Sequence, residues 1–235
     1  MSSAAVRQWP APIDHVYILC DAAREPERAA YLHGWFAAHA IDPASYTMGL
    51  TCYGDTLTVA DAYRVYNPWV NRKPVEQQRN FNSYNLKRGE ISLCVNWAAA
   101  AAAAVVAGHD VVMFLESDVL FGDTFLADLG AALSTAPAAW DFLSLSEGPQ
   151  LRPRRPVGST GLAWFPAAGY YHTRTTDAMV FRVDMLKKIV GSFFPFAEVL
   201  DWELNYQLTL HRSQSFWLDP PIIRQGSGRE YATTL

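Results

Sequence analysis

The chain has few cysteines, and their arrangement excludes one common use of this residue. Cys20, Cys52 and Cys94 are the three cysteines among 235 residues, and no two of them form a Cys-x-x-Cys pair. An odd, widely spaced set without a suitable arrangement of nearby histidines is not the pattern of a zinc site. We therefore expect buried free thiols in a reducing compartment.

The sequence also lacks an excess of positive charge and a long apolar run. Lys and Arg number 19 against 23 for Asp and Glu, and the net charge of -4 disfavours nucleic acid as a partner. The first residues have no apolar core of a signal peptide. The most apolar later run, residues 98–107, is half as long as a bilayer span, which takes ~20 residues. We expect a cytoplasmic protein without a transmembrane segment.

Two phosphate-handling motifs are missing as well. The chain has no Gly-rich loop of the GxxxxGK[ST] kind and no Asp-x-Asp-x-Thr nucleophile segment. These absences disfavour a nucleotidyltransferase or a phosphatase, although acidic residues after an apolar strand also serve such enzymes.

Apolar, β-rich runs and helical repeats alternate along the chain. The predicted strands are residues 15–20, 45–53, 110–120, 140–146, 178–182 and 215–218. The predicted helices are residues 25–39, 88–107, 122–134, 184–190 and 201–211. Such alternation predicts an α/β sandwich, Rossmann-like, with a mainly parallel central sheet in a single domain over residues 1–235. The polar stretches 67–85 and 150–166 are expected to be loops, the second a candidate lid.

An acidic triplet, Glu116-Ser117-Asp118, follows the apolar run 111–115. Carboxylates at the end of a buried strand need a compensating charge, and ligands in open α/β sheets bind outside the carboxyl ends of the strands. Alternation along the strand would place Glu116 and Asp118 on one side and turn Ser117 away. We therefore expect Asp118 and Glu116 to bind Mn²⁺ or Mg²⁺. The alternative is that these acids cap the next turn or pair with arginines.

Several features around the triplet occur in a fixed order. Before it stand Gly89, Glu90, Ile91 and Cys94, then an alanine-rich helix. This order resembles the central region of glycosyltransferase family 25, the lipopolysaccharide and collagen-type sugar transferases. That family shows a Gly-Glu-Ile-Gly-Cys segment, a Ser-His pair, a helix and a strand ending in Glu-Asp-Asp. Two positions depart from the pattern, since Asn96-Trp97 replaces Ser-His and Ser117 replaces the middle acid.

Other segments are similar to the same family in the same order. They are residues 16–28, 176–182, 200–204 and 220–227, and Arg28 is the best match for a basic residue of the family. The resemblance implies a GT-A type fold, a divalent metal and a UDP-sugar donor carrying galactose or glucose. It also implies a set of donor-binding residues, namely Leu19, Cys20, Arg28, Glu90, Glu116, Ser117 and His172. A lone histidine such as His172 is also commonly a hydrogen-bonded loop residue.

A pair of carboxylates at the start of a predicted helix gives the catalytic candidates. Asp201 and Glu203 lie in the segment LDWEL, beside an aromatic residue. The acceptor hydroxyl needs a general base, and we expect Asp201 to be that base in an inverting single displacement, with Glu203 supporting it or the acceptor. The alternative is that Asp201 caps the helix and Glu203 favours its dipole.

The resulting hypothesis is a metal-dependent glycosyltransferase that moves a hexose to a hydroxyl of a glycan, lipid-linked or protein acceptor. The alternative from a different class is a non-catalytic carbohydrate-binding or adapter protein that keeps the transferase fold. The departures at Asn96-Trp97 and Ser117 motivate that alternative.

Overall fold

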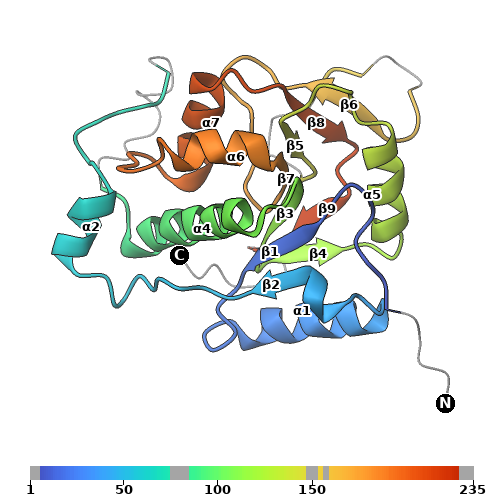
Figure 1. The fold of residues 1–235 in the computed structure, drawn as a ribbon, viewed down its shortest axis with the longest axis horizontal. Helices are drawn as coiled ribbons and strands as arrows, with labels where there is room; N and C mark the ends of the chain where they lie inside the picture. Colours follow the sequence, from blue (N-terminus) through green and yellow to red (C-terminus); the bar gives the residue numbers. More distant parts are fainter. Residues whose placement is uncertain (1–5, 75–84, 147–152, 156–158, 228–235) are drawn as a thin grey trace.

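A computed structural model describes residues 6–74, 85–146, 153–155 and 159–227 of the chain. A seven-stranded sheet runs through its centre in the order β2-β1-β3-β7-β5-β8-β6 (Figure 1). Its strands are β1 (His15–Leu19), β2 (Tyr46–Met48), β3 (Val111–Glu116), β5 (Phe142–Ser144), β6 (Ala163–Pro166), β7 (Ala178–Arg182) and β8 (Ser215–Asp219).

Most strands of this sheet run in the same direction. β1 pairs in parallel with β2 and with β3, and β5 pairs in parallel with β8. β7 is antiparallel to both β3 and β5, and β6 is antiparallel to β8. The chain is therefore a mixed α/β domain with a mostly parallel central sheet, which confirms the predicted fold class.

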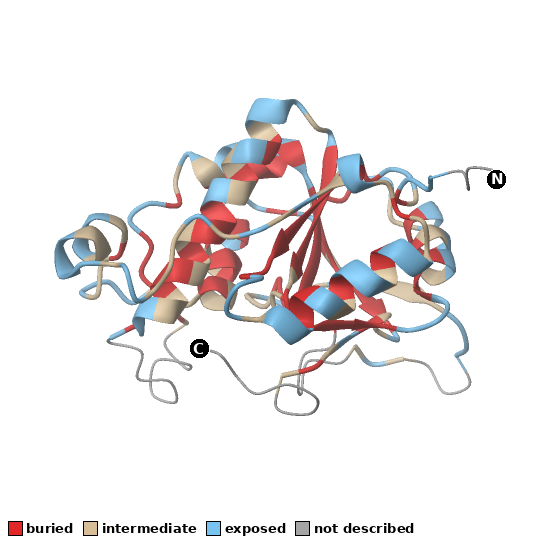
Figure 2. Ribbon diagram, turned by 90° about the horizontal axis from the view of Figure 1, so that it is seen from below, coloured by how far each residue is buried: buried red, intermediate tan, exposed pale blue. Residues whose placement is uncertain are grey.

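Alternate residues of the central strands face opposite sides of the sheet. In β3, Val111, Met113 and Leu115 belong to one buried cluster, and Val112 and Phe114 belong to another. The unbroken apolar run is explained by this arrangement, because both faces of the strand are covered. Figure 2 shows the strands buried between helices whose outer sides are exposed.

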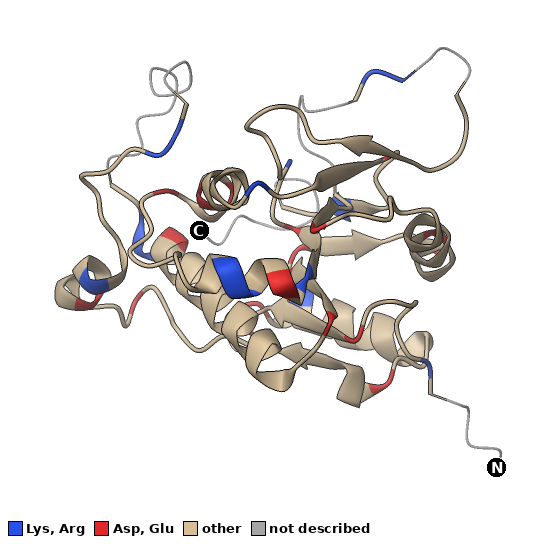
Figure 3. Cartoon of the chain, turned by 45° about the horizontal axis from the view of Figure 1, so that its top comes forward, with Lys and Arg blue, Asp and Glu red and all other residues tan. Residues whose placement is uncertain are grey.

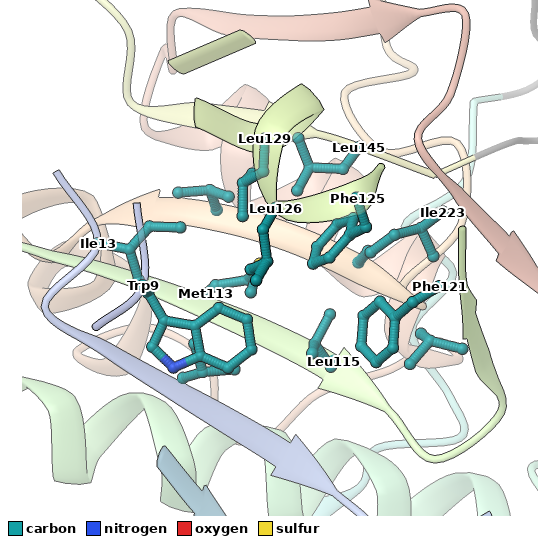
Figure 4. Packing of buried hydrophobic residues seen from close by; sticks show 14 of the residues in the cluster. Trp9, Ile13, Met113, Leu115, Phe121, Phe125, Leu126, Leu129, Leu145 and Ile223 are labelled. Atoms are coloured by element: carbon teal, nitrogen blue, oxygen red, sulfur yellow. The ribbon is translucent and has the colours of Figure 1, made fainter. Parts of the chain in front are cut away.

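One face of the sheet is covered by α1 (Pro26–Ala38) and α5 (Phe125–Ser134). Phe125 and Leu129 of α5 pack in the same cluster as Met113 of β3, as Figure 4 shows. The small second sheet, in which β4 (Val119–Phe121) pairs antiparallel with β9 (Ile223–Gln225), contributes Phe121 and Ile223 to this cluster.

The other face is covered by the remaining helices. They are α2 (Val59–Val65), α4 (Arg88–Ala107), α6 (Val183–Val190) and α7 (Leu200–Leu210). The alanine-rich part of α4 buries Ala98, Ala101 and Ala104 at helical spacing, and these small side chains let the helix lie close to its neighbours. Gly108 ends α4 in the left-handed conformation at φ 72°.

Helix α4 is longer than the apolar run that the sequence singles out. Its 20 residues are long and apolar enough to cross a membrane by length and composition alone. In the fold, however, the helix packs through its buried stripe as part of the second core cluster. Core packing of this kind accounts for the apolar composition without a bilayer.

The structure differs from the predicted elements at several points. The predicted strand 110–120 is divided, because the chain turns at Ser117 and Asp118 and β4 joins the second sheet. The predicted strand 45–53 is reduced to β2, and β6, β9 and α2 are additional elements. Residues 75–84, 150–152 and 156–158 of the two predicted loops lie outside the described residues.

Candidate active site at the carboxyl ends of β1 and β3

A cavity of about 470 Å³ opens where β1 and β3 end. Its lining comes from the segment after β1, the loop after β2, the first turns of α4 and the acidic triplet. The lining residues are Leu19, Asp21, Arg24, Glu25, Arg28, Leu50, Tyr53, Gly54, Gly89, Ser92, Leu93, Asn96, Glu116, Ser117, Asp118, Gln225 and Ser227. The cavity therefore lies outside the carboxyl ends of parallel strands, where ligands bind in folds of this class.

All three residues of the triplet line this cavity, which corrects the expected alternation. β3 ends at Glu116, and Ser117 and Asp118 form a turn rather than extended strand. A turn does not send alternate side chains to opposite sides, so Ser117 is not directed away from the site. Leu19 is the parallel partner of Glu116 across the two strands, and it also lines the cavity.

The two acids of the triplet have unusual surroundings. Asp118 is 3% exposed, and its Oδ1 atom has no hydrogen-bond partner among the described residues. Glu116 accepts a hydrogen bond of 2.5 Å from the Thr176 hydroxyl. Burial, and after it the charges of Asp118, Asp177 and Asp201, raise the pKa of Glu116 to about 8. Negative charge is therefore disfavoured here unless a cation joins the site.

Ser117 belongs to a hydrogen-bonded triangle at the side of the cavity. An Nη1 atom of Arg28 lies 2.6 Å from the Glu25 carboxylate and donates to the Ser117 hydroxyl at 3.0 Å. The same hydroxyl donates to Glu25 at 2.9 Å, and Arg28 also donates to the Ser227 hydroxyl at 3.3 Å. The structure thus brings together Arg28 and Ser117, which are 89 residues apart in the sequence.

Among the described residues that line the cavity, carboxyl groups outnumber guanidinium groups. Its charged lining consists of Asp21, Glu25, Glu116, Asp118, Arg24 and Arg28. Arg28 pairs with Glu25, and Arg24 pairs with Asp21 at 3.2 Å and with the exposed Asp55 at 2.8 Å. Both arginines are therefore already paired, and the carboxyl groups in excess are those of Glu116 and Asp118.

This surplus fits a divalent cation that is shared with a bound ligand. Within the described ranges, no group of three or more His, Cys, Asp or Glu is arranged to hold a metal by protein ligands alone. Mg²⁺ is nevertheless commonly held by one or two carboxylates together with phosphate oxygens of the substrate. Asp118, with its unpartnered Oδ1, and Glu116 are oxygen donors of the appropriate kind.

Asp177 is a buried acid beside the triplet that the sequence argument does not single out. It is fully buried and immediately precedes β7, and its carbonyl oxygen accepts a hydrogen bond from the Glu116 amide at 3.0 Å. The Thr175 hydroxyl donates to Oδ1 of Asp177, whereas Oδ2 has no partner among the described residues. Burial raises the pKa of Asp177 to about 6. The sequence feature that could have identified Asp177 is a carboxylate directly before an apolar strand, within the segment 176–182.

The departure at Asn96-Trp97 has a structural explanation. The Asn96 amide oxygen accepts hydrogen bonds from the Thr51 and Cys52 amides at 2.8 and 2.9 Å, and its nitrogen donates to the Cys52 carbonyl at 2.7 Å. Asn96 thereby fixes the loop after β2 as a wall of the cavity. Trp97 is fully buried and packs against Phe114 with ring centroids 5.5 Å apart. Asn96 therefore shapes the cavity, and Trp97 fills the hydrophobic core.

Three predicted donor-binding residues lie away from the cavity lining. Cys20 is fully buried in the core cluster beneath α1, where burial raises its pKa to about 12. Glu90 accepts a hydrogen bond of 2.6 Å from the Lys87 amide and so caps the start of α4. His172 is buried between α7 and β8. Its ring nitrogens lie 2.7 Å from the Ser215 hydroxyl and 3.1 Å from the Thr209 hydroxyl, which makes it a bonded loop residue.

The cysteines agree in part with the expectation of buried thiols. All three are free, and Cys20 and Cys94 are buried, whereas Cys52 is partly exposed next to the cavity wall.

The two acids of α7 differ from each other. Asp201 is partly buried in the first turn, and its Oδ1 accepts a hydrogen bond of 2.8 Å from the Trp202 amide. It is not the N-cap, because that position is Val199. Burial raises the pKa of Asp201 to about 6. Glu203 is fully buried, accepts bonds of 2.9 Å from the Ala197 amide and the Gln207 side chain, and pairs with Arg72.

A short segment of chain is fastened to the start of α7. Besides the pair between Arg72 and Glu203, Lys73 forms an ion pair of 2.8 Å with Glu198, and both side chains are at most 2% exposed. The Arg72 amide also donates to Glu198 at 3.1 Å. Residues 72–73 thus hold the region before α7 in place. The sequence did not reveal these pairs, because their partners are more than 120 residues away.

Comparison with known proteins adds little to this geometry. No family model matches the chain, and no curated protein sequence matches it. The expected membership of glycosyltransferase family 25 thus has no support from these comparisons. Among solved structures, the chain is similar to a glycosyltransferase involved in the glycosylation of the major capsid of PBCV-1. The identity is 9% and the TM-score 0.33, over 91% of this chain and 93% of that chain.

Proposed function

We propose that the chain is a metal-dependent glycosyltransferase that moves a hexose, galactose or glucose, from a UDP-sugar to an acceptor hydroxyl. The surplus of carboxylate at the end of β3 carries this proposal. Glu116 and Asp118 face a cavity of about 470 Å³, which suits a small-molecule ligand. A diphosphate would be repelled by these acids alone, whereas Mn²⁺ or Mg²⁺ on them would attract it.

Each group around the cavity has a role in this proposal. Asp118 and Glu116 would hold the cation, and a cation held there would neutralise the charge that develops on the departing diphosphate. Arg28 orients Ser117 beside this position through the bonds described above. Arg24 lies over the Tyr53 ring at 4.7 Å, and both line the cavity, so they offer a charged and an aromatic surface to the nucleotide.

Asp201 is the proposed general base. A carboxylate with a pKa of about 6 is largely ionised at neutral pH and is a stronger base than an ordinary carboxylate. Asp201 takes the proton of the acceptor hydroxyl while that oxygen attacks the anomeric carbon and the bond to the diphosphate breaks. This single displacement inverts the anomeric centre. Glu203 supports the base indirectly, because its bonds to Arg72 and Gln207 fix α7.

The distribution of charge supports a small anionic donor rather than a nucleic acid. Figure 3 shows basic and acidic positions interspersed along the described ribbon, without an extended region of one sign. The acceptor in this proposal is a glycan, a lipid-linked sugar or a protein side chain, and the reaction belongs in the cytoplasm.

Titration of the protein with UDP, with and without Mn²⁺, tests the proposal. We expect UDP to raise the melting temperature only when Mn²⁺ is present, and UDP-galactose or UDP-glucose to be hydrolysed slowly by water. Stabilisation by free triphosphates instead would favour a phosphotransfer enzyme. Donor binding without turnover across a panel of acceptors would favour the carbohydrate-binding or adapter protein.

A further inference from the structure

Three aromatic rings gather beside Asp201 and outside both core clusters. Trp202 follows Asp201 in the first turn of α7, and its ring centroid lies 6.2 Å from that of Tyr170 and 5.8 Å from that of Tyr171. All three side chains are partly exposed, and none packs with the two hydrophobic clusters that cover the sheet. We call Tyr170, Tyr171 and Trp202 the aromatic cluster.

The aromatic cluster is held rigidly by its neighbours. The Tyr170 hydroxyl donates to the Arg72 carbonyl at 2.7 Å, and the Lys73 ammonium lies 5.6 Å from the centre of the Trp202 ring. Lys73 is itself fixed by its buried pair with Glu198. Because its hydroxyl bond fixes the Tyr170 ring before any ligand arrives, little ordering of that ring is needed when one binds.

The position of the aromatic cluster separates it from the donor cavity. No residue of α7 is among the described residues that line that cavity. Residues 170–176 connect the two regions, because Thr176 donates to Glu116 at the cavity while Tyr170 and Tyr171 contact Trp202, the neighbour of Asp201. A molecule resting on the rings would therefore lie next to the proposed base.

The chemistry of the surroundings selects the class of ligand. The C–H bonds on one face of a pyranose ring pack well against the negative face of an aromatic ring, while the hydroxyls at its edge need polar partners. Asp201 is partly exposed and adjoins Trp202 in the chain, and its carboxylate suits such hydroxyls, whereas Lys73 and Glu198 are buried in a pair with each other. An acyl chain would be poorly served by the same charges.

We propose that Tyr170, Tyr171 and Trp202 form the acceptor subsite and bind one pyranose ring of a saccharide, with a ring hydroxyl directed at Asp201. The inference rests on the proposed function and narrows its acceptor to a glycan or a lipid-linked sugar. A protein side chain as acceptor would not use this surface.

Direct binding of simple sugars tests the subsite without any donor. Methyl β-D-galactopyranoside and methyl β-D-glucopyranoside, at millimolar concentrations, are measured by saturation-transfer NMR. We expect at least one of them to bind. Affinity should fall roughly tenfold in Trp202→Leu and in Tyr171→Leu, because each loses a stacking face. Trp202→Phe keeps a ring and should retain most of the affinity.

Tyr63→Leu is the matched control, since Tyr63 is 61% exposed on α2 and lies outside the aromatic cluster. Three results overturn the subsite: no binding of either sugar, unchanged binding in both leucine variants, or displacement of the sugar by UDP. The same samples are melted with UDP and Mn²⁺. Sugar binding without UDP binding would contradict the proposed function alone, and the reverse would contradict the subsite alone.

Discussion

The buried acids before and within α7 differ from those at the end of β3 in their partners. Glu198 pairs with Lys73 at 2.8 Å, and Glu203 pairs with Arg72, so each has a cation from the chain itself. These pairs satisfy the charge of the acids and hold two distant segments together. Acids that are paired in this way need no additional cation from solution.

Within the described residues, the acids around the end of β3 have no such cation. Asp118 is 3% exposed and Asp177 is fully buried, and each has one carboxylate oxygen without a hydrogen-bond partner in the described chain. The arginines that line the cavity are paired with other carboxylates. The comparison teaches that burial alone does not mark a functional acid. A functional acid is distinguished by being buried beside a cavity while no cationic side chain of the described protein pairs with it.

The largest effect on stability should come from breaking a paired acid. In Glu198→Gln, Lys73 loses its carboxylate partner while it remains 1% exposed, and we expect the free energy of unfolding to fall by about 3–5 kcal/mol. Urea unfolding followed by circular dichroism measures it. Replacing both residues, with Lys73→Met and Glu198→Leu, should recover most of the loss. If Glu198→Gln lowered the free energy of unfolding by less than about 1 kcal/mol, the paired acids would not differ from the unpaired acids in their contribution to stability.

Loss of an unpaired acid should instead act on catalysis. Asp118→Asn removes the charge that holds the cation, so we expect turnover of the UDP-sugar to fall by about 10²- to 10³-fold and its dependence on Mn²⁺ to disappear. The control is Asp184→Asn, whose side chain is 85% exposed on α6. Equal activity of the two variants at saturating Mn²⁺ would show that Asp118 holds no catalytic metal.

Metal binding should depend on pH in a direction set by Glu116. Because its pKa in the metal-free protein is about 8, Glu116 is mostly protonated at pH 7 and must lose its proton to bind a cation. The affinity for Mn²⁺ should therefore rise with pH up to about 8 and then level off. Calorimetry at several pH values, in buffers of different ionisation enthalpy, should also show proton release. An affinity that is constant between pH 6 and 8 would exclude Glu116 as a ligand.

The smallest effect concerns the metal-free protein. A carboxyl whose pKa is raised in the folded state stabilises the fold below its unfolded pKa, and that contribution is lost as pH rises through the folded value. Without metal, stability should thus decline as pH approaches about 8, the pKa of Glu116. Asp118→Asn removes the repulsion between the charges of Asp118 and Glu116 and should therefore flatten the decline of stability with pH. The free energy of unfolding at pH 8 should rise by on the order of 1 kcal/mol. Thermal melts across this range would test it, and a steeper decline in the variant would contradict the repulsion.

Much of the fold could be predicted because it depends on local patterns. The apolar run of β3 and the alanines of α4 have strong periodic signals, and both elements formed as expected. The short strands β6 and β9 were missed, because three or four residues beside prolines give little signal. The division of the segment after Glu116 was also missed, since a turn at Ser117 depends on the pairing of β4 with β9.

Residues of the candidate site could be predicted only where the reactive groups lie close together in the sequence. The triplet and Arg28 were found and lie together at the cavity. Asp177 was missed, because its closeness to Glu116 results from the antiparallel pairing of β3 and β7. His172 and Glu203 are both held by bonds within the fold, to Ser215 and to Arg72, that their residue types did not indicate. Sequence therefore reveals candidate groups, and tertiary pairing decides which of them remain available to a ligand.

A crystal structure with Mn²⁺ and UDP tests the central claim most directly. The account predicts an anomalous manganese peak about 2.1 Å from Oδ1 of Asp118, with Glu116 beside it and diphosphate oxygens completing the coordination. A well-ordered UDP without metal at these acids, or Asp118 bonded instead to arginine or backbone amides, would contradict the account.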